Sequence, residues 1–126
     1  MVEVGKSMEK LILVVEDESA IRELIIEIIN EKNYCKCSGA GSGSRALELM
    51  KTITFDLITL DMNMPEMDGN GFLKELSIIG SAIPVIVITA TPKSLQLHPL
   101  VKEVIAKPFD IEQIITVLDQ HIGNLV

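Results

Sequence analysis

Apolar residues fall into short continuous runs along this chain, and a polar residue directly follows each of the four clearest runs. These runs are Leu11–Val15, Leu57–Leu60, Val85–Ile88 and Val104–Ala106, and Tyr34–Ser38 is interpreted as a short second strand. Continuous apolar runs of this length are typical of strands that are covered on both faces of a sheet. The pattern therefore predicts five strands.

The stretches between these strands carry apolar residues at helical spacing. Isoleucine and leucine recur every three or four residues from Glu18 to about Lys32, which predicts an amphipathic helix there. Helices are also predicted from Ser44 to about Lys51, from Gly69 to about Ile79, and from Ile111 to Ile122 behind a possible cap at Asp110. Pro92–Lys102 lacks this spacing, so we expect the fourth helix to be short or irregular.

Strands and helices alternate, and this alternation predicts an α/β fold: a doubly wound, five-stranded parallel sheet with helices on both faces. A length of 126 residues fits a single domain. We assign residues 10–126 to that domain and residues 1–9 to an N-terminal extension. Because 48% of the residues are hydrophobic but only 3% aromatic, we expect an aliphatic core.

The charge and hydropathy of the chain exclude some classes of partner. A net charge of −7 makes direct binding to nucleic acid or to an anionic membrane unfavourable. The longest uncharged apolar stretch, Ile78–Ala90, is interrupted by glycine, serine and proline and is too short to span a bilayer. Met1–Lys10 contains no apolar segment typical of a signal peptide. We therefore expect a cytoplasmic protein without nucleic-acid or membrane partners.

Several other residues have ordinary explanations. A disulfide between Cys35 and Cys37 on one strand would be strained, and a metal site there would lack further ligands, so we interpret both as packed strand residues. His98 and His121 are expected at the surface. Gly39–Gly43 resembles a phosphate-binding loop only weakly and is interpreted as a flexible strand-to-helix turn.

The polar residues that follow the strands form the most informative feature of the sequence. Glu16-Asp17, Asp61, Thr89 and Lys107 come directly after four of the predicted strands. In a parallel α/β sheet the carboxyl ends of the strands converge on one edge, where ligands bind. We therefore expect three carboxylates, one hydroxyl and one ammonium to meet in one crevice.

This set of groups suits phosphoryl chemistry. Carboxylates that are close together repel, and a bound Mg²⁺, which prefers oxygen ligands, would relieve that repulsion. Asp61 is the best candidate for a nucleophile, because a carboxylate can carry a phosphoryl group. Lys107 would supply fixed positive charge, and Thr89 could donate a hydrogen bond to a phosphoryl oxygen.

These residues occur in motifs that resemble the receiver domain of two-component response regulators over essentially the whole chain. The motifs are Glu16-Asp17, Asp61–Gly69, Thr89-Ala90 and Lys107-Pro108-Phe109. The resemblance implies a flavodoxin-like sheet of strand order 2-1-3-4-5. It also implies a cis Lys107–Pro108 bond, which proline makes accessible.

The resemblance further implies a function and its partners. A sensor histidine kinase or a histidine phosphotransfer protein would pass a phosphoryl group to Asp61, and the changed surface would act on a downstream protein target. Mg²⁺ would be held by Asp17, Asp61 and the main-chain carbonyl of Asn63, with Glu16 acting through water. We expect a signalling phosphoacceptor rather than an enzyme, with self-phosphotransfer and slow autodephosphorylation.

The sequence departs from the family pattern at two places. The family often has an aromatic residue three positions before the lysine, where this chain has Val104, so we expect no aromatic switch. The stretch between Thr89 and Lys107 is also short and carries Pro92 and Pro99. Both departures concern the output surface, so we expect output to use a rearranging segment rather than a moving ring.

Two other functions would use the same residues. A Mg²⁺-dependent phosphohydrolase of the haloacid-dehalogenase type would need a cap domain and a second acid two residues after the nucleophile, where this chain has Asn63. A receiver-like scaffold would bind partners without phosphorylation, but the intact Asp61, Thr89 and Lys107 argue against it.

Overall fold

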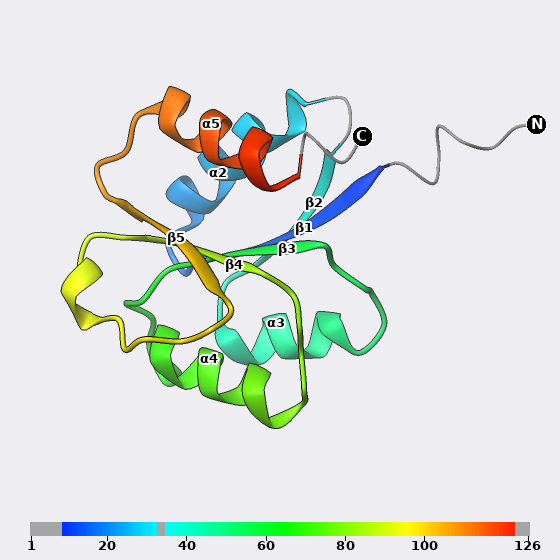
Figure 1. Ribbon diagram of the computed structural model, residues 1–126, viewed down its shortest axis with the longest axis vertical. Coiled ribbons are helices and arrows are strands. Elements are labelled where there is room, and N and C mark those ends of the chain that lie inside the picture. The colour runs from blue at the N-terminus through cyan, green and yellow to red at the C-terminus, as the bar shows by residue number, and fades with distance from the viewer. Residues whose placement is uncertain (1–8, 33–34, 123–126) are drawn as a thin grey trace, which may run out of the picture.

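Figure 1 shows the computed structural model, in which a five-stranded parallel sheet lies between two layers of helices. The structure describes residues 9–32 and 35–122. The strands are β1 (Lys10–Val15), β2 (Cys35–Ala40), β3 (Leu57–Leu60), β4 (Val85–Thr89) and β5 (Val101–Ala106). The helices are α2 (Ser19–Asn30), α3 (Gly43–Met50), α4 (Gly69–Ile78) and α5 (Ile111–His121), with a 3-10 turn η1 (Pro92–Ser94). The strand order β2-β1-β3-β4-β5 confirms the predicted doubly wound fold.

Two apolar clusters, one on each side of the sheet, form the core. Successive residues of a strand point to opposite faces, so Ile12 and Val14 enter one cluster while Leu13 and Val15 enter the other. Helices α2 and α5 cover the first cluster, and α3 and α4 cover the second (Figure 1). The core is aliphatic apart from a few residues such as the fully buried Phe72, as the composition predicted.

The edge strands differ from the prediction. β5 begins at Val101 rather than Val104, because Val101 pairs with Val85 before a bulge shifts the register. As an edge strand, β5 alternates between partly buried and exposed residues instead of forming a continuous apolar run. β2 runs to Ala40, two residues past the predicted end at Ser38, because Gly39 and Ala40 pair with the end of β1.

The expected irregularity between β4 and β5 is confirmed, because only the single turn η1 is helical there. The side chain of Asn70 on α4 holds this segment: its Nδ2 donates to the Ser94 carbonyl at 2.7 Å, and its Oδ1 accepts from the Gln96 N–H at 2.9 Å. His98 lies 2.7 Å from the Ser77 hydroxyl and accepts from the Leu100 N–H.

Both histidines are partly exposed at the surface, and each also contacts a neighbouring element. His98 is half-buried against α4, and His121 is half-buried and lies 3.3 Å from Glu103 on β5. Each histidine contacts a residue that is distant in the sequence, Ser77 for His98 and Glu103 for His121, and the local sequence pattern does not reveal such contacts.

Helix ends and cysteines agree largely with the sequence. α4 begins at Gly69, and the Asp68 side chain caps it by accepting from the Gly71 N–H at 2.8 Å. Asp110 takes the cap position of α5, but its side chain makes no cap hydrogen bond; its backbone carbonyl accepts instead.

Cys35 and Cys37 are both free. The start of the predicted second strand at Tyr34 and nearly all of the predicted extension 1–9 lie outside the described residues. No helix in the described ranges is long and apolar enough to cross a bilayer.

Candidate functional site

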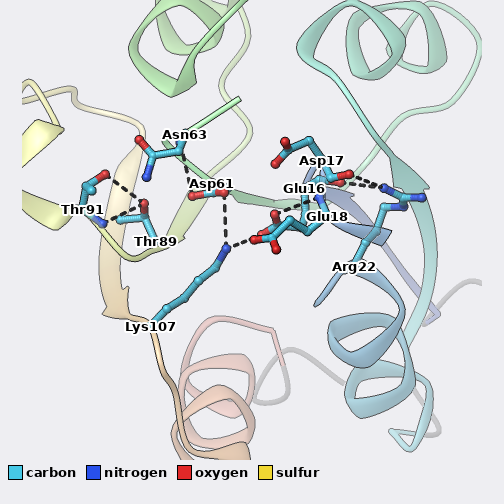
Figure 2. A network of polar contacts seen from close by, with 9 residues as sticks. All are labelled: Glu16, Asp17, Glu18, Arg22, Asp61, Asn63, Thr89, Thr91 and Lys107. Carbon is cyan, nitrogen blue, oxygen red and sulfur yellow. Dashed lines mark hydrogen bonds and ion pairs between the residues drawn. The ribbon is translucent and has the colours of Figure 1, made fainter. Parts of the chain in front are cut away.

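The strand ends bring the predicted polar residues to one edge of the sheet (Figure 2). Backbone hydrogen bonds continue the sheet ladder past the last strand residues: Glu16 N–H donates to Ala40 at 3.0 Å, and Asp61 N–H donates to Val15 at 3.1 Å. Lys107 N–H donates to the Thr89 carbonyl at 2.9 Å. The site residues are therefore anchored by the sheet itself.

Lys107 joins two of the predicted carboxylates. Its Nζ lies 2.6 Å from Glu16 Oε1 and 3.3 Å from Asp61 Oδ2. The side chains of Glu16 and Asp61 are only 1% and 4% exposed, so this pairing satisfies charges that water barely reaches. The Lys107–Pro108 peptide bond is cis, as the family resemblance implied.

Burial and charge shift the ionisation of the Lys107–Glu16 pair. Burial raises the pKa of Glu16 from 4.5 to about 7; the hydrogen bond from Lys107 opposes this shift and the charge of Asp61 adds to it. Burial alone would lower the pKa of Lys107, but the hydrogen bonds and charges of Glu16 and Asp61 outweigh it and raise that pKa. Lys107 therefore remains an ammonium at neutral pH, while Glu16 is poised to exchange a proton.

The three acids are close enough to share a cation. One carboxylate oxygen from each of Glu16, Asp17 and Asp61 lies within 4.8 Å of the others. Lys107 pairs with Glu16 and Asp61, so Asp17 is the acid of this group that forms no ion pair with the lysine within the described residues. Carboxylate oxygens that leave room for water are the ligands that Mg²⁺ prefers. The residues present therefore fit Mg²⁺.

The two remaining predicted residues, Asn63 and Thr89, do not point their side-chain polar groups at Asp61 or Lys107 through a hydrogen bond within the described ranges. The Asn63 N–H donates to Asp61 Oδ1 at 3.3 Å, while the role of the Asn63 carbonyl as a metal ligand stays a prediction. Thr89 is fully buried, and its hydroxyl oxygen accepts from the Thr91 N–H at 3.2 Å and lies 3.4 Å from the Thr91 hydroxyl. Within the described ranges, Thr89 makes no side-chain hydrogen bond to Asp61 or Lys107.

Sequence reasoning missed Thr91 and Arg22. Thr91 holds the Thr89 hydroxyl, and Arg22 donates to the Glu16 carbonyl at 2.8 Å. A signal for Arg22 was available, because side chains in an α-helix lean toward its N-terminus and a long side chain in the first turn can reach the preceding loop. The direction of the Thr89 hydroxyl depends on its rotamer, which the sequence pattern does not specify.

Comparison with known proteins gives similarities over most of the chain. Residues 12–119 match the family model of the response regulator receiver domain. Sporulation initiation phosphotransferase F of Bacillus subtilis is 37% identical over 113 residues, which cover 85% of this chain and 89% of that protein. Chemotaxis protein CheY of Thermotoga maritima is 29% identical over 117 residues, covering 90% and 98%. The receiver domain of the Francisella response regulator 1452 has a TM-score of 0.79 at 26% identity, covering 94% and 100%.

Proposed function

The chain belongs to the response regulator receiver domain family, the phosphoacceptors of two-component signalling, and we propose that Asp61 is the residue that takes up the phosphoryl group. One observation carries this proposal: Asp61 is a buried carboxylate 3.3 Å from the Lys107 ammonium and beside two further acids. The site thus combines a nucleophile with the positive charge and the cation ligands that phosphoryl transfer needs.

The transfer step follows from these groups. An Asp61 oxygen forms a bond to phosphorus while the bond from phosphorus to the donor atom breaks, and the donor atom keeps the electron pair. Lys107 then binds a phosphoryl oxygen, and Thr89 turns its hydroxyl from Thr91 toward the new group. Self-phosphorylation from small donors and slow autodephosphorylation belong to this proposal.

For the metal, we propose Asp17, Asp61 and the Asn63 carbonyl as ligands, with Glu16 acting through water. Bound Mg²⁺ would neutralise charge on the phosphoryl oxygens. The carboxylate cluster supports this assignment by its oxygen donors, and Asp17 is the member of the cluster that forms no ion pair with Lys107 within the described residues.

The partners follow from the family. Receiver domains interact with histidine kinases or histidine phosphotransfer proteins, and we propose a donor of that class here, with a downstream protein that reads the phosphorylated surface. We also propose that residues 10–126 form the receiver domain, in keeping with β1 starting at Lys10. The cytoplasmic location expected from the sequence stays a prediction.

A small acyl phosphate donor, added with and without Mg²⁺, tests the proposal by intact-mass measurement over time. We expect one long-lived phosphoryl adduct that needs Mg²⁺ and is absent in Asp61→Asn. Rapid multiple turnover without a lasting adduct would instead favour the phosphohydrolase, and no reaction would favour the scaffold. An adduct of equal yield in Asp61→Asn would contradict the assignment of Asp61.

A further inference from the structure

Arg22 stands in the first turn of α2 and reaches back over the end of β1 (Figure 2). Its Nη1 donates to the Glu16 carbonyl at 2.8 Å and lies 3.5 Å from the Asp17 carbonyl. Within residues 9–32 and 35–122 the guanidinium forms no ion pair. Its side-chain hydrogen bonds there go to backbone carbonyls, so Arg22 fixes the backbone that carries the acidic pair.

Asp17 depends on this backbone more than the other acids do. Lys107 contacts both Glu16 and Asp61, and the Asn63 N–H further holds Asp61. By contrast, the Asp17 carboxylate has no hydrogen bond or ion pair within the described ranges, although it lies within 4.8 Å of the other two carboxylates. The main chain at residues 16–17 therefore sets the direction in which the Asp17 side chain leaves the backbone.

Two glycines near the end of β2 leave room for the arginine. A Cβ atom on Gly41 would lie 3.3 Å from Arg22 Nη1, and one on Gly39 would lie 3.1 Å from Arg22 Cδ and 3.0 Å from Ile26 Cδ1. All three distances are tighter than ordinary packing, so a Cβ on Gly41 would push against the guanidinium and one on Gly39 against the Arg22 stem and Ile26. These glycines, interpreted from the sequence as a flexible turn, thus provide space for Arg22.

We propose that Arg22 is a positioning residue for the Mg²⁺ site: by holding the Glu16 and Asp17 carbonyls, it aims the Asp17 carboxylate at the cation. This inference rests on the proposed function, because it presumes that Asp17 binds the metal. A purely electrostatic role makes the opposite prediction, since the charge of Arg22 repels a cation and its removal would strengthen binding.

Mg²⁺ titrations of the full chain, followed by NMR amide shifts, separate these roles. Residues that orient metal ligands typically change metal affinity by 10-fold or more, so we expect Arg22→Met to raise the Mg²⁺ dissociation constant about tenfold. Arg22→Lys should also weaken binding, because a lysine keeps the charge but its side chain ends one atom short of the arginine Nη1 atom that contacts both carbonyls. Lys36→Met, which removes the same charge at the opposite end of β2, should match the wild type.

Gly41→Ala disturbs the Arg22 guanidinium without changing Arg22 itself, because the added Cβ would lie 3.3 Å from Nη1. It should weaken Mg²⁺ binding less than Arg22→Met does, and adding it to Arg22→Met should cause no further loss, because both act through one guanidinium. Circular dichroism checks folding, and Arg22→Lys with Gly41→Ala carries the test if Arg22→Met does not fold. Unchanged or tighter binding in the folded Arg22 variants, with Asp17→Ala abolishing binding, would overturn the role of Arg22 alone. Mg²⁺ binding that survives Asp17→Ala would overturn the proposed metal site as well.

Discussion

At the residue scale, Lys107 allows two buried carboxylates to share one edge of the sheet. Its ammonium lies 2.6 Å from Glu16 and 3.3 Å from Asp61. Two like charges about 4 Å apart repel by roughly 4 kcal/mol at an effective dielectric of 20, and a paired ammonium offsets that cost. A phosphoryl group adds roughly −1.5 to −2 charge at neutral pH. Phosphorylated Asp61 would therefore compete with Glu16 for the same lysine.

The raised pKa of Glu16 predicts a dependence of stability on pH. Glu16 has a pKa of about 7 in the folded protein against 4.5 otherwise, so between these values the folded state holds a proton that the unfolded chain has lost. The free energy of unfolding should therefore fall as pH rises through this window, by on the order of 3 kcal/mol from this group. The raised pKa of Lys107 acts only at much higher pH, because its ordinary value is 10.5.

Denaturant unfolding of the wild type and Glu16→Gln, in chelator at about pH 5 and about pH 8, measures this effect. Between about pH 5 and about pH 8, the free energy of unfolding should fall by about 3 kcal/mol more in the wild type than in Glu16→Gln. The variant serves as the control for every other titrating group, since it retains them all. Equal pH dependence in the two proteins would show that Glu16 is not the group responsible.

At the element scale, the segment between β4 and β5 is held to α4 by few contacts. Asn70 makes two hydrogen bonds to its backbone, and Ser77 contacts His98. Leu97 in this segment is fully exposed. Leu95 and Leu100 pack against the second apolar cluster but are only partly buried, so the segment is expected to open at a lower free energy than the sheet.

Removing the Asn70 side chain should loosen this segment. Asn70→Ala deletes both hydrogen bonds, each typically worth about 1 kcal/mol, and should speed hydrogen exchange at the Gln96 amide by about tenfold. Lys74→Ala, which alters an exposed residue on the same helix, is the matched control. Hydrogen exchange followed by NMR makes the comparison, and an unchanged Gln96 rate in Asn70→Ala would mean that other contacts hold the segment.

The same segment is where we expect phosphorylation to be read. A phosphoryl group on Asp61 would attract Thr89, the last residue of β4, and Lys107, the residue that follows β5. The exposed Val104 on β5 offers no aromatic ring to move. NMR shifts with a phosphoryl mimic should therefore concentrate at residues 90–106, as a change in population of the segment. Shifts confined to α2 and β2, with residues 90–106 silent, would contradict this prediction.

At the scale of the whole molecule, the two-sided core should make unfolding sensitive to single buried residues. Phe72 on α4 is fully buried, and Phe72→Ala should cost about 3–5 kcal/mol of unfolding free energy through lost burial and the cavity left behind. Ile78→Ala on the same helix, where the side chain is 67% exposed, should cost less than about 0.5 kcal/mol. Urea unfolding compares them, and similar losses would mean that the core is not organised as described.

The fold and most of the site could be predicted because burial on both faces leaves a strong pattern. The central strands are continuous apolar runs, and the residue after each run, such as Asp61, is fixed at the sheet edge by the ladder. The edge strand β5 was predicted at Val104–Ala106 but its start at Val101 was missed, because a bulge and one-sided burial hide it. The contact of Arg22 with the Glu16 carbonyl was also missed: helical spacing places Arg22 in the first turn of α2, but the space that its guanidinium occupies is left by Gly41, in the turn after β2.

The central claim, that Asp61 carries the phosphoryl group, is tested most directly by mapping the modified residue. Borohydride reduces an aspartyl phosphate to homoserine, and peptide mass spectrometry then locates that residue in protein treated with a phosphodonor and Mg²⁺. Our account predicts homoserine at position 61 alone, and none in Asp61→Asn. Homoserine at Asp17 or at any other aspartate, with position 61 unmodified, would contradict it.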